Sequence, residues 1–217
     1  MLPVAEICPQ LVQSLKQHNK VILSAPPGAG KSTYLPLFLL NHADFSGKTI
    51  LLLEPRRLAA KSIAGYLAAQ LGEAVGESVG YQIRFEQQYS ARTRLLIVTE
   101  GVLIRKIQQD PELAGVDLLI FDEFHERSLQ ADLALALSLE VQQLNETLKL
   151  LVMSATLMAT AAGGLVFGFL ADRLGRARSM MLSIICYSVG TALCGLADTL
   201  GQLMLFRIIV GLGVGGE

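Results

Sequence analysis

The sequence is poor in cysteine, with Cys8, Cys186 and Cys194 among its 217 residues. Three cysteines at these separations make neither a disulfide framework nor a metal-ligand pattern, so we expect no disulfide partner and a reducing compartment. We also expect no N-terminal signal peptide, because residues 1–15 carry Glu6 and no basic stretch before an apolar run. The number and spacing of the cysteines argue against a disulfide scaffold and a zinc site.

Net charge is also low, since 18 basic and 19 acidic residues leave -1 at pH 7. The chain as a whole therefore does not attract nucleic acid, and any such contact must come from local clusters. Charge is unevenly spread, and it is scarce from residue 150 onward. The first two-thirds has the charge density of a soluble protein, whereas the apolar remainder is typical of a membrane segment.

A phosphate-binding loop is the clearest motif. Residues 25–33 read A-P-P-G-A-G-K-S-T, which is the G-x-x-x-x-G-K-[ST] pattern with Ala25 at its first position. An apolar run at 21–23 predicts a strand before it, and residues 34–40 predict a helix after it. This strand, loop and helix order favours a triphosphate site over an incidental glycine-rich turn. We expect the site to be formed by the following residues: Gly28, Ala29, Gly30, Lys31, Ser32 and Thr33.

Within that loop, each residue type has a distinct use. Small residues let consecutive backbone N–H groups surround the phosphates, and the following helix directs its N-terminus at the same anion. Lys31 is placed to reach the β- and γ-phosphates, and the Ser32 hydroxyl is placed to ligate Mg²⁺.

Further apolar runs at residues 49–53, 94–98, 117–121 and 149–153 alternate with helical patterns at 58–71, 102–109 and 129–144, and a short amphipathic helix is expected at 7–17. Buried strands that alternate with helices of this length predict a parallel, doubly wound α/β sheet with helices on both faces. Polar motifs follow directly after the strands, at the sheet edge where such folds bind ligands.

The carboxylates Asp122 and Glu123 directly follow one of these strands. Two adjacent acids at a buried strand end repel each other unless a cation is near. We therefore expect Asp122 to hold Mg²⁺ and Glu123 to polarise an attacking water. His125 is expected to couple this hydrolysis site to the hydroxyls of Ser154 and Thr156.

A second group of polar residues suits a nucleic-acid strand. Arg56 and Arg57 follow the strand at 49–53, and Thr99 and Gly101 follow the strand at 94–98. Arginine side chains and backbone N–H groups at such positions contact phosphates of a single strand.

Five short motifs, in this order along the chain, resemble motifs I, Ia, Ib, II and III of DExH-box helicases. They are A-x-x-G-x-G-K-S-T, P-R-R, T-E-G, D-E-F-H and S-A-T. The stretch at residues 80–86 is similar to that of the DEAH/RHA group, and the start of the chain resembles its bacterial HrpB-type members. The resemblance covers about residues 1–157 and implies a RecA-like P-loop NTPase domain that uses ATP and Mg²⁺. It also implies single-stranded RNA or DNA as a partner.

The same resemblance implies two RecA-like domains with ATP between them. Nothing after Thr156 resembles the second domain and its arginine fingers. We therefore expect an incomplete ATP-dependent helicase that does not unwind on its own, because such arginines supply about 10³ to 10⁵ in rate for related phosphoryl transfers.

From residue 158 the pattern changes. Residues 179–197 carry no charge, and about 20 apolar residues span a bilayer. The loop G-F-L-A-D-R-L-G-R-A-R and the later R-I-I-V-G-L-G-V-G-G resemble spans two to four of major facilitator superfamily transporters. This resemblance singles out the following residues: Gly168, Asp172, Arg173, Gly175, Arg176 and Arg207.

The sequence thus predicts two parts, a helicase-like ATPase at 1–157 and an all-α transmembrane fragment at 158–217, whose partner is membrane lipid. Three functions stay open: an ATP-dependent nucleic-acid enzyme, a transporter fragment, and a chimera with no integrated activity. The ATPase part is expected in the cytoplasm, and the chain is membrane-associated if its C-terminal segment inserts. No Gly/Ser/Pro-rich linker separates the two parts, so a junction near Leu157 and Met158 is the simplest interpretation.

Overall fold

The computed structural model describes residues 3–25, 28–124, 128–154 and 175–194, together with residues 167, 169–171, 173, 202, 206, 209, 210 and 213. The chain divides into two compact units. The first consists of Met1–Leu23 and Gly28–Ser154, and the second of Ser24–Pro27 and Ala155–Glu217.

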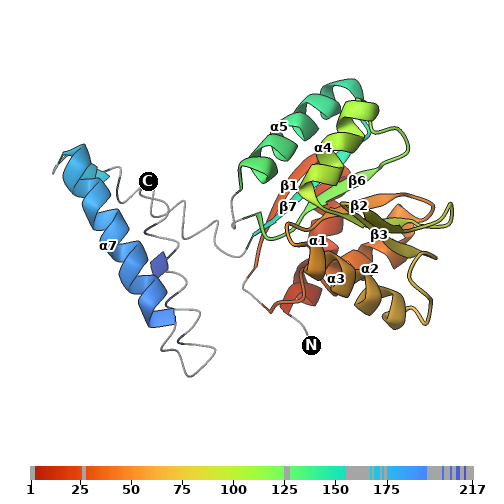
Figure 1. Ribbon diagram of the computed structural model, residues 1–217, viewed down its shortest axis with the longest axis horizontal. Helices are drawn as coiled ribbons and strands as arrows, with labels where there is room; N and C mark the ends of the chain where they lie inside the picture. Colours follow the sequence, from red (N-terminus) through yellow and green to blue (C-terminus); the bar gives the residue numbers. More distant parts are fainter. Residues whose placement is uncertain are drawn as a thin grey trace. The chain divides into compact units, whose positions relative to one another are not determined.

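A seven-stranded sheet forms the centre of the first unit (Figure 1). Its strands are β1 (Lys20–Ser24), β2 (Ile50–Leu53), β3 (Val79–Ile83), β4 (Glu86–Gln88), β5 (Leu95–Val98), β6 (Leu118–Phe121) and β7 (Lys149–Ser154). They lie in the order β1-β7-β6-β2-β5-β3-β4. The pairs β2/β5, β2/β6, β3/β5 and β6/β7 are parallel, which confirms the predicted α/β sheet.

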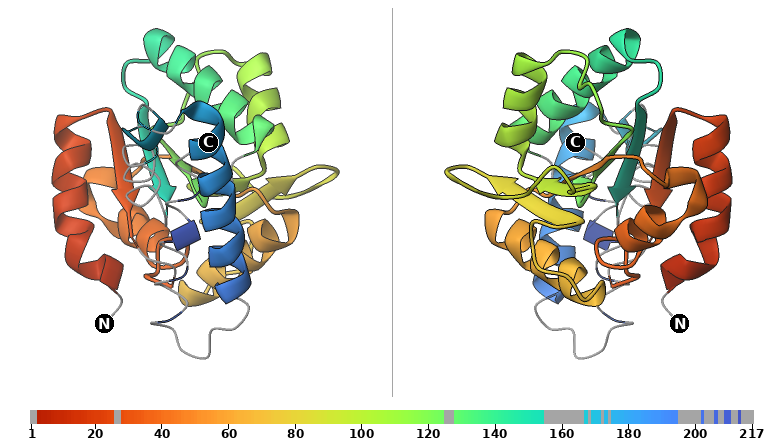
Figure 2. Two further views of the ribbon diagram at one scale, coloured as in Figure 1. Left: turned by 90° about the vertical axis from the view of Figure 1, so that its left-hand side faces the viewer. Right: turned by 90° about the vertical axis from the view of Figure 1, so that its right-hand side faces the viewer.

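Helices cover both faces of this sheet (Figures 1 and 2). They are α1 (Pro3–Gln17), α2 (Leu35–Asn41), α3 (Arg57–Gln70), α4 (Glu100–Gln109) and α5 (Leu129–Leu144), with a short 3₁₀ turn at Ala43–Phe45. In both figures α4 and α5 lie on one face, and α1, α2 and α3 lie on the other. The layered arrangement buries the apolar strands on both sides.

Side chains alternate between these two layers along each strand, as the strand period requires. Leu51 and Leu53 of β2 and Leu119 and Phe121 of β6 belong to the core cluster that includes Leu103 of α4 and further residues of α4 and α5. The residues between them, such as Ile50 and Leu118, are also fully buried. Strands of this kind read as continuous apolar runs, which is why the sequence identified them.

The edge of the sheet differs from the prediction of an all-parallel arrangement. Strand β4 pairs with β3 in antiparallel register, with Tyr81 opposite Gln88 and Ile83 opposite Glu86. The two strands form a hairpin that turns at Arg84 and Phe85, and Phe85 has a positive φ of 70°. The side chains of β4 are exposed, so its sequence has no apolar run to reveal a strand.

The helix predicted at residues 34–40 after the phosphate loop is present as α2 (Leu35–Asn41), one residue from the expected start. The N–H groups of Tyr34 (2.8 Å) and Leu35 (3.2 Å) both donate to the carbonyl of Gly30, and α2 begins only at Leu35. Pro36 has no N–H with which to continue the ladder to Ser32, so a single turn separates the loop from α2.

The second unit contains α7 (Arg176–Cys194). Several apolar side chains of α7 are exposed, namely Met180, Met181, Leu182, Ile184, Ile185, Tyr187 and Val189. In the part of the chain that the structure describes, no helix combines the length and the apolar character that crossing a bilayer requires. The predicted transmembrane fragment is thus not supported by the described helices.

Backbone packing in this unit is close. A Cβ added to Gly190 would lie 2.9 Å from Val210 Cγ2, and one added to Gly213 would lie 2.5 Å from the backbone nitrogen of Tyr187. Only glycine permits such an approach, so both positions join α7 to residues 209, 210 and 213.

Gly80 of β3 gives a testable consequence of the hairpin. A Cβ at this position would lie 2.6 Å from the carbonyl oxygen of Gln88 and 2.7 Å from Tyr89 Cβ. We expect Gly80→Ala to lower the free energy of unfolding by roughly 1–3 kcal/mol in urea titration, because backbone must shift to admit the methyl group.

Gly65, within α3, provides the control, since an added Cβ there meets nothing within 4 Å. Gly65→Ala is expected to raise the free energy of unfolding by about 0.5–1 kcal/mol, as alanine is the better helix former. Equal effects of the two substitutions would contradict the close approach at Gly80.

Candidate functional site

The phosphate loop is held in a curved form by glycine conformations and by α1. Gly28 and Gly30 have φ values of 75° and 93°, a region that residues with a Cβ avoid. Ala29 is buried, and its carbonyl accepts a hydrogen bond from the N–H of Val4 at 3.2 Å. Thr33 is partly buried in the turn that follows. The curvature that a phosphate cradle requires is thus built into the backbone.

The side chain of Lys31 lies near the carboxylates of Asp122 and Glu123, which follow β6. Lys31 and Asp122 are each only 3% exposed. Burial lowers the pKa of the Lys31 ammonium, whereas the nearby carboxylates of Glu123 and Asp122 raise it. The structure therefore brings together Lys31 from the loop and the two acids that follow β6, although about 90 residues separate them in sequence.

Burial makes the ionised form of the Asp122 carboxyl less favourable than it is in water. Burial raises the pKa of this carboxyl to about 6, although the Ser32 hydroxyl, which hydrogen-bonds to it, lowers the pKa. Its Oδ1 accepts a hydrogen bond from the N–H of Glu123 at 2.8 Å. Its Oδ2 is buried and has no hydrogen-bond partner among the described residues.

An orphaned carboxylate oxygen beside a serine hydroxyl fits a magnesium ion. Mg²⁺ prefers oxygen ligands and binds proteins through one or two carboxylates together with waters and substrate phosphates. Ser32 and Asp122 would hold the ion here, and the ion would neutralise phosphate charge during transfer. The chemistry of these donors therefore agrees with the expected cofactor.

Glu123 occupies an unusual backbone conformation, with φ of 47°. Non-glycine residues in this region are uncommon, and at ligand sites they often aim a side chain in a particular direction. The next residue, Phe124, packs edge-on against Phe121 with ring centroids 6.1 Å apart, which anchors the chain after β6. A cavity of about 220 Å³ lies here, lined by Asp122 and Glu123 among others.

Three of the four residues expected to contact nucleic acid line a second, larger cavity. Arg57, Thr99 and Gly101 line a cavity of about 890 Å³, whereas Arg56 lines the smaller one. Arg56 and Arg57 are exposed at the start of α3. Thr99 is buried, and its carbonyl accepts hydrogen bonds from Val102 and Leu103 at the start of α4.

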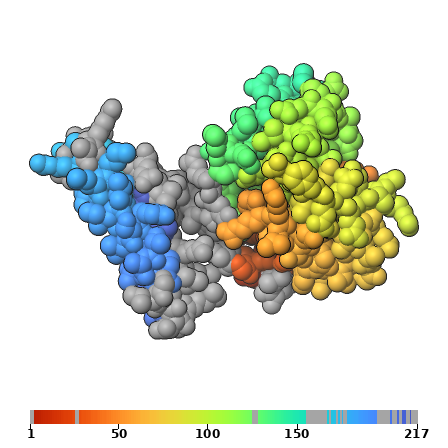
Figure 3. All heavy atoms as spheres, viewed as in Figure 1, coloured from red at the N-terminus to blue at the C-terminus, as the bar shows by residue number. Residues whose placement is uncertain are grey.

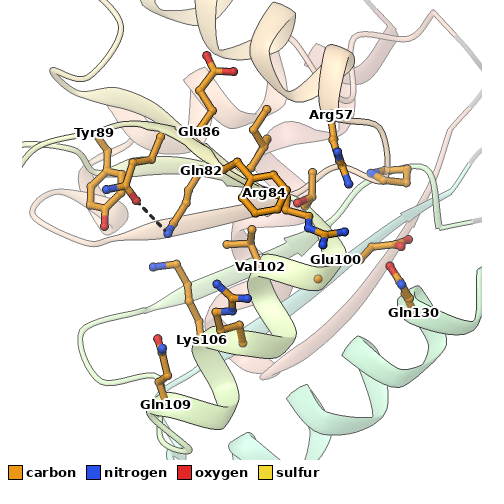
Figure 4. A pocket seen from close by; sticks show the side chains of 17 residues that line it. Arg57, Gln82, Arg84, Glu86, Tyr89, Glu100, Val102, Lys106, Gln109 and Gln130 are labelled. Atoms are coloured by element: carbon orange, nitrogen blue, oxygen red, sulfur yellow. Dashed lines mark hydrogen bonds between the residues drawn. The ribbon is translucent and has the colours of Figure 1, made fainter.

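The other walls of the larger cavity come from the β3–β4 hairpin and α4, whose side chains were not among the predicted site residues. Figure 4 shows Val102 and Lys106 of α4 facing Gln82 and Arg84 of the hairpin. In Figure 3 the yellow surface of the hairpin adjoins the yellow-green surface of α4. Burial lowers the pKa of Lys106, whose ammonium lies 5.8 Å from the centre of the Tyr89 ring.

The hairpin turn presents a cation and an aromatic ring together. Phe85 is exposed at the turn, and the Arg84 guanidinium lies 4.7 Å from the centre of its ring. Below the turn, Glu86 is bound by Tyr81 and by Lys61 of α3, the latter at 2.7 Å. In the sequence, the hairpin was marked only by the G-Y-Q-I-R-F-E stretch, whose spacing alone indicates no chemistry.

Several predicted site residues lie outside the described residues: His125, Thr156, Gly168, Asp172 and Arg207. Ser154 is fully buried at the end of β7, the strand next to β6. In the second unit, Arg173 lies with its guanidinium 4.5 Å from the centre of the Phe169 ring. Gly175 has φ of 85°, and Arg176 is the first residue of α7.

This fold, with a phosphate loop after β1 and paired acids after β6, is that of a P-loop NTPase domain. The chain belongs to the DEAD/DEAH box helicase family, whose family model matches residues 5–162. This result confirms the resemblance to DEAH-box helicases that the motifs gave.

Among its relatives is the ATP-dependent RNA helicase HrpB of Escherichia coli (strain K12), which is 61% identical over 157 residues. That match covers 72% of this chain and 19% of the relative. The ATP-dependent RNA helicase HrpA of Borreliella burgdorferi is 39% identical over 156 residues, with the same coverage. The chain thus spans about one fifth of the length of these relatives.

Solved structures of helicases match the same part of the chain as these relatives do. The crystal structure of Escherichia coli DEAH/RHA helicase HrpB has a TM-score of 0.69 and 59% identity, and the match covers 72% of this chain and 20% of that one. The N-terminal part of the chain therefore corresponds to one part of a DEAH-box helicase that resembles HrpB, and the match is only partial.

A second family model, described as "Sugar (and other) transporter", matches residues 116–217. It overlaps the helicase match between residues 116 and 162. Within this overlap, β6 and β7 are strands of the seven-stranded sheet, and α5 is the helix that connects them.

The raised pKa of Asp122 makes a prediction about stability. A carboxyl that binds its proton more tightly when folded loses stability as pH rises from about 4 to about 6. In metal-free buffer, we expect the free energy of unfolding of the wild type, relative to Asp122→Asn, to fall by roughly 3 kcal/mol over this window. Urea titrations at pH 4 and pH 7 measure it, and parallel pH dependence in the two proteins would contradict a buried Asp122 charge.

Proposed function

We propose that residues 1–157 form an ATP- and Mg²⁺-binding domain of a DEAH-box helicase. The observation that carries this proposal is the joint burial of Lys31 and Asp122 beside Ser32, with one Asp122 oxygen unpartnered. Lys31 binds the β- and γ-phosphates, Ser32 and Asp122 hold Mg²⁺, and the N–H groups of the loop surround the phosphates. Glu123 orients the attacking water, and His125, Ser154 and Thr156 couple hydrolysis to the rest of the domain.

Single-stranded RNA is the partner that we propose for the larger cavity. Its support is the cluster of Arg57, Arg84, Arg105 and Lys106 around an opening that also contains an exposed aromatic ring. Cations there bind phosphates, and rings stack on bases. Binding of a single-stranded oligoribonucleotide that weakens steeply as salt rises would support this proposal, and salt-independent binding would oppose it.

The 217-residue polypeptide tested alone is expected to bind ATP without displacing a strand from a duplex. The match covers only 19% of these relatives, and we propose that strand displacement needs parts that lie outside the matched region. Strand displacement by this polypeptide would disprove the expectation. A cytoplasmic location is proposed for this ATPase part because it uses ATP.

Lys31 gives the direct test of nucleotide binding. Lys31→Ala removes the one charged side chain that the loop offers to the phosphates, and charge-assisted hydrogen bonds contribute about 1.5–3 kcal/mol each. We expect the affinity for Mg·ATP, measured by calorimetry on the full chain, to fall at least about tenfold.

The control is Lys20→Ala, which removes an exposed lysine at the start of β1. It is expected to leave the affinity within about twofold of the wild type, since this lysine is solvated. Nucleotide binding that survives Lys31→Ala unchanged would remove the basis of the proposed function.

For residues 158–217 we propose a transporter-derived segment that associates with lipid, so that the chain joins two unrelated parts. The support is the exposed apolar side chains of α7 and its close, glycine-mediated packing at Gly190 and Gly213. Small residues at helix contacts are typical of membrane helices. Arg173, Arg176 and Arg178 supply the positive charge that favours anionic headgroups.

Vesicle flotation tests this second proposal. Met181 and Ile185 lie four positions apart on one exposed face of α7, and burying each contributes about 1.5–3 kcal/mol. We expect the double variant Met181→Glu/Ile185→Glu to partition at least about tenfold less onto vesicles of phosphatidylcholine and phosphatidylglycerol. Leu58→Glu, an exposed position on α3, is the control and should float like the wild type, and equal flotation of all three would contradict the proposal.

A further inference from the structure

The two cavities of the first unit share a wall. Glu100 and Pro55 are the residues that line both the 890 Å³ cavity and the 220 Å³ cavity. Glu100 lies between Thr99 and Gly101 at the start of α4, and only 8% of it is exposed. A buried carboxylate at this place faces the proposed RNA cavity on one side and the cavity of Asp122 on the other.

Glu100 is bound by a serine that begins the next helix. The Ser128 hydroxyl donates to Glu100 Oε1 at 2.8 Å, and the same hydroxyl accepts a hydrogen bond from the N–H of Ala131, also at 2.8 Å. Ser128 is therefore the N-cap of α5 and a partner of the first residue of α4 at the same time. Figure 4 shows Glu100 directed toward the start of α5, where Gln130 is labelled.

The two residues of this hydrogen bond are each close in sequence to residues that line one of the two cavities. Glu100 is flanked by Thr99 and Gly101, which line the larger cavity. Ser128 follows Asp122 and Glu123 by only a few residues and lines the smaller cavity with them. A hydrogen bond to a carboxylate is stronger than one between neutral groups, and this one is partly buried, so water competes with it less than at the surface.

We propose that the Glu100–Ser128 hydrogen bond is a positioning link that couples occupancy of the RNA cavity to the geometry of Asp122 and Glu123. Phosphate binding at the start of α4 moves Glu100, Glu100 moves Ser128, and Ser128 changes the shape of the smaller cavity that it lines with Asp122 and Glu123. This inference rests on the proposed function, because both ligands must bind. Glu100 and Ser128 touch neither ligand in this account, so they are positioning residues.

The experiment measures how much binding of one ligand changes the affinity for the other. Affinity of the full chain for Mg²⁺ with a non-hydrolysable ATP analogue is measured with and without saturating oligouridylate, and the ratio is the coupling factor. By linkage, the same factor must appear when oligouridylate affinity is measured with and without nucleotide. We expect a factor of about five or more in the wild type, the lower end of ordinary allosteric coupling.

Ser128→Gly removes the hydroxyl while keeping a residue that is well tolerated at an N-cap. We expect its coupling factor to fall below about two, with each single-ligand affinity within about threefold of the wild type. Ser128→Thr keeps the hydroxyl and should restore the wild-type factor. Ser138→Ala is the matched control, because it removes a buried hydroxyl of the same helix, which donates to the carbonyl of Ala134 within that helix.

Three results would overturn the link: a wild-type factor of one, a wild-type factor in Ser128→Gly, or an equal loss in Ser138→Ala. If circular dichroism shows that Ser128→Gly is unfolded, Glu100→Gln takes its place, since it keeps the side-chain volume and removes the charge. Its factor is expected to fall, and an unchanged factor refutes the link. Failure of the wild type to bind either ligand alone is a different result, since it defeats the proposed function and this inference with it.

Discussion

The structure of the ATPase part depends on the burial of opposite charges at one edge of its sheet. Lys31 and Asp122 are almost fully excluded from water, and isolated charges in such surroundings are costly. Their mutual attraction offsets part of that cost, and the Asp122 oxygen that stays unpartnered offers the place for a cation. The loop curvature, the strand order and the helix caps all serve to hold these two side chains at the same place.

Strand order explains why the charges meet there. The loop follows β1, the acids follow β6, and β7 lies between these two strands with Ser154 at its end. Three motifs that are far apart in sequence thus come from three neighbouring strand ends. Strand β7 is essential to this arrangement, because it joins β1, which precedes the loop of Lys31, to β6, which precedes Asp122.

The strands and the charged cluster could both be predicted from the sequence because the sheet is parallel and buried on both faces. Parallel strands buried on both faces leave continuous apolar runs, and ligand residues must follow their ends. What it missed depends on contacts between distant segments. Strand β4 carries exposed Glu86, Gln87 and Gln88 and exists only through pairing with β3. Ser128 reads as an ordinary helix cap, and its bond to Glu100 arises only when α4 and α5 pack together.

The overlap of two family matches at residues 116–162 has a physical resolution within the first unit. Leu118 and Phe121 of β6 are in register with Ile50 and Leu53 of β2, and β6 is in turn paired with β7. These strands cannot leave for a membrane without exposing the core of the sheet. The α5 helix between them is rich in leucine and alanine, with exposed Leu129, Leu133 and Leu144, so its composition approaches that of a membrane helix. Register therefore assigns residues 118–154 to the helicase sheet, and transporter character must be judged from the segment beyond it.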